Sequence, residues 1–271
     1  MNKYLAGCCL VALLATSCVS KGNRQEKESV SAQQTASADR EAHITPQYAK
    51  GFQLSYADGY ILMDIQDPQN EESTRFQYAL VERGTKPEGI PADYTVIEIP
   101  VRSAICMTSL QLSNFIKLGA EDKVVGITST RHLFNQTVNK QLKEGKTAKI
   151  GIEGNFDNEV IMSINPDLIL ISPFKRGGYE TMKDIGIPLI PHLGYKETTP
   201  LGQAEWIKFV GLLLGMEKEA NDKFSAIEKR YNELKALTAE GQVKKRPIVF
   251  SGEIHGGNWY AVGGKSFLAQ L

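Results

Sequence analysis

The feature that most constrains this chain is an alternation of helical and strand patterns between Thr108 and His192. Within it, Asp167–Ser172 (DLILIS) is a continuous aliphatic run, which is typical of a strand that is covered on both faces. Segments with helical apolar spacing lie on either side of this run, and further short apolar runs lie beyond them. Because helices alternate with strands, the sequence predicts a mainly parallel sheet and therefore an α/β fold.

End signals place the elements of this alternation. Thr108–Leu118 predicts a helix, because Thr108 and Gln111 have the spacing of a capping box and a glycine follows. Asp157 is expected to cap a second helix, which Pro166 ends. The other expected elements are strands at Lys123–Ser129 and Pro188–His192, a brief strand from Ile150, and helices at Asn135–Glu144 and Gly178–Ile185.

Strand patterns also precede the alternation. Phe52–Tyr56 and Tyr60–Ile65 flank Asp58-Gly59, a dipeptide that is typical of tight hairpin turns. Arg75–Val81 and Tyr94–Val101 are two further expected strands, separated by a loop rich in glycine and proline.

A long helical pattern follows the alternation. It begins at Thr199-Pro200, where a capping hydroxyl precedes a proline at the first helical position. Apolar residues at helical spacing then continue on both sides of Gly215. We therefore expect residues 200–240 to form one long helix with a bend near Gly215, or two helices stacked end to end.

A new β-α unit is expected after Arg246-Pro247. It consists of a strand at Ile248–Ser251, a glycine-rich turn at Glu253–Gly257, a strand at Trp259–Val262 and a helix from Ser266. Because the sequence stops within this apolar helix, we expect residues 246–271 to be the start of a second α/β lobe that is truncated.

The first residues have the pattern of an export signal. Lys3 precedes eleven uncharged residues, Tyr4–Leu14, and small residues then lead to Cys18. We expect residues 1–17 to be a signal peptide and Cys18 to carry a lipid, as in bacterial lipoproteins. Ordinary secretion with a spare cysteine is the alternative. Residues 18–47 are poor in large apolar side chains, so we expect a flexible tether that leads to an N-terminal lobe at residues 48–199.

Composition and motif content exclude several function classes. Lys plus Arg and Asp plus Glu both number 31, so the chain lacks the excess positive charge of a nucleic-acid-binding protein. The sequence contains none of the patterns HExxH, CxxC and GxSxG, and we expect no enzyme activity. Gly264-Lys265-Ser266 resembles the end of a Walker motif, but Trp259 stands where its first glycine should be. Cys106, which remains after export and acylation, lies in an apolar run and is expected to be buried.

Four stretches of the sequence match the layout of one known family. In the most recognisable, Asn158-Glu159 opens a helix and Pro166-Asp167 precedes an aliphatic strand. The other three are Val124–Ser129, Glu205–Gly215 and Trp259–Leu268. Over roughly residues 95–271 the chain resembles class III periplasmic substrate-binding proteins, which serve ABC importers of iron-siderophores, haem and cobalamin.

The resemblance implies a two-lobed fold, with mainly parallel sheets joined by a long helix at residues 200–240 and a ligand between the lobes. Open α/β sheets bind ligands beyond the carboxyl ends of their strands in any case. Loops at those ends carry aromatic and cationic side chains, which suit a flat or anionic chelate. The expected ligand-binding residues are Arg131, His132, Phe174, Lys175, Arg176, Tyr195, His255, Asn258, Trp259 and Tyr260.

The resemblance also implies a function and partners. A membrane-anchored lipoprotein of this kind captures an iron-siderophore or haem and delivers it to an ABC permease in the inner membrane. We expect a monomer with no resident cofactor or metal besides the chelate itself. Glu159 resembles the glutamate with which the family's N-terminal lobe meets arginines of the permease. The alternative is a carboxylate that is simply favoured by the helix dipole.

Three other functions remain open from the sequence. Cobalamin is a further ligand of the same family. A bare transition ion would bind if His132, His192 and His255, which each follow a predicted strand, met in the cleft. A lipid-anchored sensor or adaptor that delivers no cargo is the third. A mass spectrum of the isolated protein separates these functions, because it shows a chelate, a bare metal or nothing.

Overall fold

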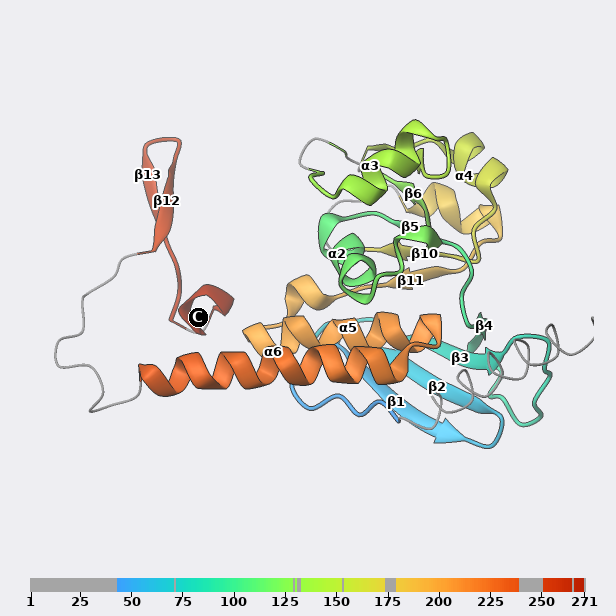
Figure 1. Cartoon of the computed structure of the whole chain (residues 1–271), viewed down its shortest axis with the longest axis horizontal. Coiled ribbons are helices and arrows are strands. Elements are labelled where there is room, and N and C mark those ends of the chain that lie inside the picture. Colours follow the sequence, from blue (N-terminus) through green and yellow to red (C-terminus); the bar gives the residue numbers. More distant parts are fainter. Residues whose placement is uncertain are drawn as a thin grey trace, which may run out of the picture. The chain divides into compact units, whose positions relative to one another are not determined.

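The alternating segments build a five-stranded sheet in the computed structural model of the chain (Figure 1). The structure describes residues 43–70, 72–128, 130, 133–152, 154–173, 179–238, 251–264 and 266–270. The strands of this sheet are β5 (Ala104–Cys106), β6 (Val124–Ile127), β7 (Ala148–Lys149), β10 (Leu168–Ile171) and β11 (Leu189–Pro191). They lie in the order β11-β10-β5-β6-β7, and every neighbouring pair is parallel. The predicted parallel α/β sheet is therefore confirmed.

Helices cover both faces of the sheet. Consecutive strand residues point to opposite faces, and both sets of side chains are buried in apolar clusters. Cys106 of β5 belongs to one apolar cluster and its neighbour Ile105 to the other. The first cluster includes residues of α2 (Ser109–Leu118), α3 (Gln136–Lys143) and α5 (Pro200–Leu214), and the second includes residues of α4 (Asn158–Ile164) and the 3-10 helix η2 (Glu180–Ile185). The predicted burial of Cys106 is confirmed, and this burial raises the pKa of its thiol.

The helix ends follow the capping signals of the sequence. The Thr108 hydroxyl accepts a hydrogen bond from the Gln111 backbone N–H at 3.4 Å, and the Gln111 side chain accepts one from the Thr108 N–H at 3.0 Å. Asp157 caps α4 by accepting from the Val160 N–H at 3.0 Å. The helix predicted at Gly178–Ile185 is a shorter 3-10 helix that begins at Glu180.

A second sheet precedes the first in the sequence. It has four strands in the order β1 (Phe52–Ala57), β2 (Tyr60–Ile65), β3 (Phe76–Glu82) and β4 (Thr95–Ile99). β1 and β2 form the predicted hairpin, with a two-residue turn in which Gly59 has a φ of 82°. β3 is antiparallel to β2 and parallel to β4.

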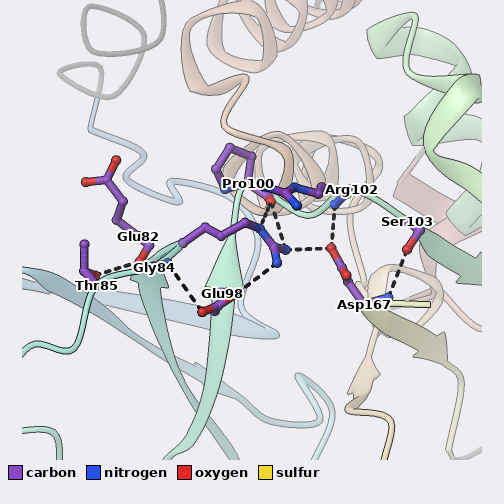
Figure 2. Close-up of polar contacts among 9 residues, drawn as sticks. Glu82, Gly84, Thr85, Glu98, Pro100, Arg102, Ser103 and Asp167 are labelled. Carbon is purple, nitrogen blue, oxygen red and sulfur yellow. Dashed lines mark hydrogen bonds and ion pairs between the residues drawn. The ribbon is translucent and has the colours of Figure 1, made fainter. Parts of the chain in front are cut away.

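Arg83, in the turn after β3, ties the four-stranded sheet to β10 of the parallel sheet (Figure 2). Its guanidinium is 2.9 Å from Glu98 and 2.7 Å from Asp167. Asp167 also accepts a hydrogen bond from the Arg102 backbone N–H at 2.7 Å, and its own N–H donates to the Ser103 hydroxyl at 3.1 Å. The aspartate before the aliphatic strand is thus a structural residue at the amino-terminal end of the parallel strands.

The helical region that follows the sheet is a helical hairpin. α6 (Glu217–Leu237) reverses direction after Gly215, which has a φ of 67°, and packs alongside α5 (Figure 1). The Lys208 ammonium nitrogen lies 4.3 Å from the centre of the Phe224 ring, which places residues on opposite sides of the turn in contact. The prediction of one bent helix or two helices stacked end to end is therefore wrong, because the left-handed glycine ends α5 and allows the chain to fold back.

Residues 43–51, which we call the N-terminal strap, are held by two buried carboxylates. Glu205 accepts hydrogen bonds from the backbone N–H groups of Gln47, Tyr48 and Ala49 at 2.6–3.0 Å. Glu197 accepts from the next two N–H groups along the strap, at 3.0 and 2.9 Å. Ile44 is fully buried. The predicted start of the folded part at residue 48 is therefore too late.

The last described segment forms an antiparallel hairpin of β12 (Gly252–His255) and β13 (Asn258–Ala261). Gly256 and Gly257 form its two-residue turn, with φ values of 58° and 82°. The predicted glycine-rich turn is thus shorter than expected, because its first residues belong to a strand. The predicted strand Ile248–Ser251 lies outside the described residues except for Ser251, and the predicted final helix is a 3-10 helix at Phe267–Gln270.

Candidate functional site

The carboxyl ends of the parallel strands meet at one edge of the five-stranded sheet. The chain runs from β5 outwards to β6 and β7, and then returns to the other side of β5 to form β10 and β11. The order therefore reverses between β5 and β10. In open α/β sheets this reversal leaves a crevice beyond the carboxyl ends, where ligands bind.

A buried glutamine joins the two strands at this reversal. The Gln111 side-chain oxygen accepts hydrogen bonds from the backbone N–H groups of Met107 and Thr108, which follow β5, at 2.7 and 3.0 Å. Its amide nitrogen donates to the hydroxyl of Ser172, which follows β10, at 3.3 Å. Gln111 is fully buried, so these bonds form without competition from water. The carboxyl ends of β5 and β10 are thereby fixed to each other.

Two further hydrogen bonds hold the bases of the loops that leave this edge. The Thr128 hydroxyl, after β6, donates to the Met107 carbonyl at 2.8 Å. The Ser172 N–H donates to the Tyr179 hydroxyl at 3.3 Å, which joins the two ends of the loop that follows β10. The edge is therefore a rigid support for the loops after β6 and β10.

Five of the predicted ligand-binding residues lie in these two loops but outside the described residues. They are Arg131, His132, Phe174, Lys175 and Arg176. The structure describes the flanking residues Thr130, Leu133, Pro173 and Tyr179, of which Thr130 follows the carboxyl end of β6 and Pro173 that of β10. Their role as ligand-binding residues stays a prediction.

His192, after β11, lies in the core rather than on a cleft surface. Its Nε2 atom is 3.0 Å from the Asn114 side-chain nitrogen, and its ring centre is 4.6 Å from that of Trp206. Burial lowers the pKa of His192 to about 3, so the ring is neutral at physiological pH. This enclosure is incompatible with the suggested three-histidine ion site, because His192 does not face an open cleft. Among the described residues, no three His, Cys, Asp or Glu side chains are grouped to hold a metal.

Tyr195 lies at the same edge, in the 3-10 helix η3 (Gly194–Lys196) after β11. Its ring is partly buried against the main core, so part of its surface serves packing. The adjacent Lys196 forms a 2.8 Å ion pair with Asp67, which follows β2. The four-stranded sheet therefore reaches the carboxyl edge of the parallel sheet through this contact.

The remaining predicted ligand-binding residues lie on the β12–β13 hairpin, and they divide between its two faces. His255 pairs with Asn258, and the His255 and Tyr260 ring centres are 6.5 Å apart. Trp259 pairs with Ile254 and points to the opposite face, because successive strand residues alternate. Trp259 is 54% exposed and Tyr260 is 56% exposed. One surface therefore does not hold all four of these side chains.

Glu159 is exposed in the first turn of α4, two residues after the Asp157 cap. This position fits both the proposed docking role and the favourable helix dipole. Cys18, the predicted lipid attachment site, lies outside the described residues. None of the helices in the described part of the chain is both long and apolar enough to cross a membrane.

Several residues that shape the edge were not singled out as site residues from the sequence. The sequence marks Gln111 only as the N3 residue of a capping box, and its second role appears only when β10 lies beside β5. Ser172 ends an aliphatic run, where a lone polar residue signals a buried hydrogen bond, whereas Asn114 follows Ser113 and carries no such signal. At Ser172 that signal indicates that a hydrogen-bond partner exists, but it does not identify the partner.

Comparisons with known proteins agree with this architecture. A sequence profile of the family described as "Periplasmic binding protein" matches residues 105–271. Two curated relatives are uncharacterized lipoproteins of Methanocaldococcus jannaschii, each 25% identical, over 84% and 76% of this chain. The matches cover 61% and 55% of those relatives, so the chain spans little more than half of their length.

A solved structure from Staphylococcus epidermidis shares the fold. It is described as a possible iron-binding (periplasmic solute-binding) protein. The similarity has a TM-score of 0.50 at 17% identity, and it covers 63% of this chain and 64% of that chain. At this identity the likeness concerns the fold alone.

Proposed function

This chain belongs to the periplasmic binding protein family, and on that premise we propose that it captures a small ligand for an ABC importer. The observation that carries the proposal is the edge where β5 and β10 are joined through Gln111. It combines a reversal of strand order with a rigid base for two loops. In the sequence those loops contain the cationic residues Arg131, Lys175 and Arg176, together with aromatic residues that include Phe174.

The ligand class that we propose is a metal chelate, namely an iron-siderophore or haem. Arginine and lysine suit anionic chelate oxygens or propionates, and aromatic rings suit flat ligand surfaces. The description of the similar Staphylococcus epidermidis protein as possibly iron-binding supports this class. Cobalamin stays an alternative ligand. A bare ion held by His132, His192 and His255 is not compatible with the enclosure of His192 in the core.

Export and anchoring are part of the same proposal. We propose that Cys18 carries a lipid and that the protein acts as a monomer on the outer side of the membrane. The names of the two Methanocaldococcus jannaschii relatives, both lipoproteins, support the anchor. Replacement Cys18→Ser should move the protein from the membrane to the soluble fraction, and unchanged membrane retention would refute the lipid.

Ligand binding can be tested on the isolated protein. Its mass spectrum should contain a chelate, and ferric siderophore, haemin or cyanocobalamin should quench its tryptophan fluorescence on titration. Arg131→Ala and Trp259→Ala should each weaken binding by about 1–3 kcal/mol, the usual range for an arginine or aromatic anchor. Lys229→Ala, at an exposed position of α6, is the control and should bind normally. Normal ligand binding by both Arg131→Ala and Trp259→Ala would show that these residues do not contact the ligand. If the chain binds none of the three ligands, a sensor or adaptor is favoured.

We further propose that Glu159 meets arginines of the permease. Charges at the rim of an interface chiefly set the association rate and the orientation of the partner. Glu159→Arg should therefore leave ligand affinity within about twofold but reduce uptake, and less so at high salt, where charge attraction is screened. Glu88→Arg, at another exposed position, is the matched charge reversal and should transport normally. Full uptake by a folded Glu159→Arg protein would leave only the helix-dipole role.

A further inference from the structure

A groove lies between the start of β3 and the edge of the parallel sheet at β11. It has a volume of about 470 Å³, which is within the range of small-molecule sites. Its walls are mainly apolar. One wall is Thr74, just before β3, and Phe76, the first residue of β3. The other wall belongs to the parallel sheet and its connections and contains Ile171, Pro173, Tyr179, Lys183, Ile187 and Leu189, of which Lys183 is the one charged residue.

The groove is continuous with the edge described above. Pro173 and Tyr179 line it, and these two residues bound the loop that contains the predicted ligand residues Phe174, Lys175 and Arg176. The Tyr179 hydroxyl also accepts the hydrogen bond from Ser172 that closes the base of this loop. A ligand bound beyond the carboxyl end of β10 therefore has the groove beside it.

The opposite wall is fixed by the segment between β2 and β3, which we call the rim loop (residues 66–70 and 72–75). Asp67 is almost fully buried and forms a 2.8 Å ion pair with Lys196. The Gln69 side chain donates to the Lys196 carbonyl at 2.6 Å. Within the rim loop, Asp67 accepts from the Gln69 N–H at 2.9 Å and donates its own N–H to the Ser73 hydroxyl at 3.3 Å. These contacts hold Thr74 and Phe76 in place.

We infer that this groove is a side pocket of the ligand site and receives a flat apolar group of the ligand, such as an aryl arm of a chelate. The inference rests on the proposed function. It adds that the protein binds chelates with an aryl arm more tightly than chelates without one. Thr74 and Phe76 supply that selection, although both lie outside the segment 105–271 that the family profile matches. An apolar ring fits here because Phe76, Ile171 and Leu189 offer apolar contact and no hydrogen-bonding side chain of their own.

Two ferric complexes that differ only in the arm test this selection. Benzohydroxamate and acetohydroxamate bind iron through the same group, but only the first carries an aromatic ring. We expect the chain to bind ferric benzohydroxamate at least tenfold more tightly than ferric acetohydroxamate, measured by fluorescence quenching. Thr74→Trp, which fills the groove from an exposed position, should abolish this preference. Leu189→Phe narrows the groove from the other wall and should act in the same way.

Gln53→Trp is the matched control, because Gln53 is exposed on the same sheet but lines a separate groove of about 850 Å³. It should keep the tenfold preference, and thermal unfolding should show that all three variants fold. A preference that survives in both Thr74→Trp and Leu189→Phe overturns the inference.

The fluorescent aromatic anion anilinonaphthalene sulfonate separates a failure of the side pocket from a failure of the proposed function. If the chain binds neither ferric complex, the proposed function is decided by titration with ferric siderophore, haemin and cyanocobalamin, and the groove is judged by this probe alone. Loss of probe emission in Thr74→Trp but not in Gln53→Trp then supports an aromatic side pocket. Equal emission from both variants overturns it.

Discussion

At the scale of single residues, charged side chains inside this protein serve mainly to join segments that are distant in the sequence. Arg83 and Asp167 connect the two sheets (Figure 2). Glu205 accepts hydrogen bonds from three successive N–H groups of the strap. Lys208 lies 2.8 Å from Glu205 and balances its charge. Glu205 is fully buried, so removal of a partner such as Lys208 would leave part of its charge unpaired in the core, which is costly.

His192 gives the chain a pH-dependent stability. The pKa of His192 in the folded chain is about 3, below the ordinary value of 6.5. On acidification the imidazole is therefore protonated in the unfolded chain before it is protonated in the folded chain. Stability is therefore present above pH 6.5 and is lost as the pH falls towards 3. Between pH 7.5 and 5 we expect the free energy of unfolding to fall by about 2 kcal/mol relative to His192→Gln, measured by urea denaturation.

Two comparisons isolate this effect. Burial raises the pKa of Glu197, which acts in the opposite direction, but Glu197 is present in both proteins and cancels in the difference. His255→Gln, the same replacement at an exposed histidine, is the control for the substitution itself. Parallel pH profiles for the wild-type chain and His192→Gln would show that the unfolded and folded states titrate alike at this residue.

At the scale of elements, local signals predicted the elements and their caps but not the direction in which α6 packs. The sequence marks Gly215 as a break, and a left-handed glycine permits either a bend or a reversal. Contacts between side chains on opposite sides of the break, such as Lys208 with Phe224, favour the reversal. The polar residues of the site pose the same problem, since Gln111 meets Ser172 only through the pairing of β5 with β10. Long-range contacts of this kind leave no local pattern.

The crossing of α5 and α6 depends on a missing side chain. A methyl group added at Gly211 would overlap the Cβ atom of Ala220. Alanine favours a helix over glycine by roughly 0.5–1 kcal/mol, but overpacking costs roughly 1–3 kcal/mol. Gly211→Ala should therefore lower the free energy of unfolding by about 1 kcal/mol, and adding Ala220→Gly should restore part of that loss. A Gly211→Ala protein as stable as the wild type would mean that the helices shift apart freely.

At the scale of the whole molecule, the folded unit is larger than the segment that identifies its family. The family profile begins at residue 105, yet the four-stranded sheet shares one core with α5 and contributes Met63, Leu80 and Ile97 to it. The strap adds Ile44 to the same core and five backbone hydrogen bonds to Glu205 and Glu197. The fold of the family domain and the extra N-terminal segment therefore stabilise each other.

Chains with different starting points test this dependence. A chain that begins at residue 43 keeps the strap and should unfold at the same urea concentration as the full chain. A chain that begins at residue 52 loses the N–H donors of Glu205 and Glu197, and hydrogen bonds to charged groups are worth roughly 1.5–3 kcal/mol each. Since a domain is stable by only about 5–15 kcal/mol in total, the shorter chain should be largely unfolded by circular dichroism at 25 °C. If it instead unfolds at the urea concentration of the longer chain, Glu197 and Glu205 bind water or other partners, and the strap does not contribute to the stability of the fold.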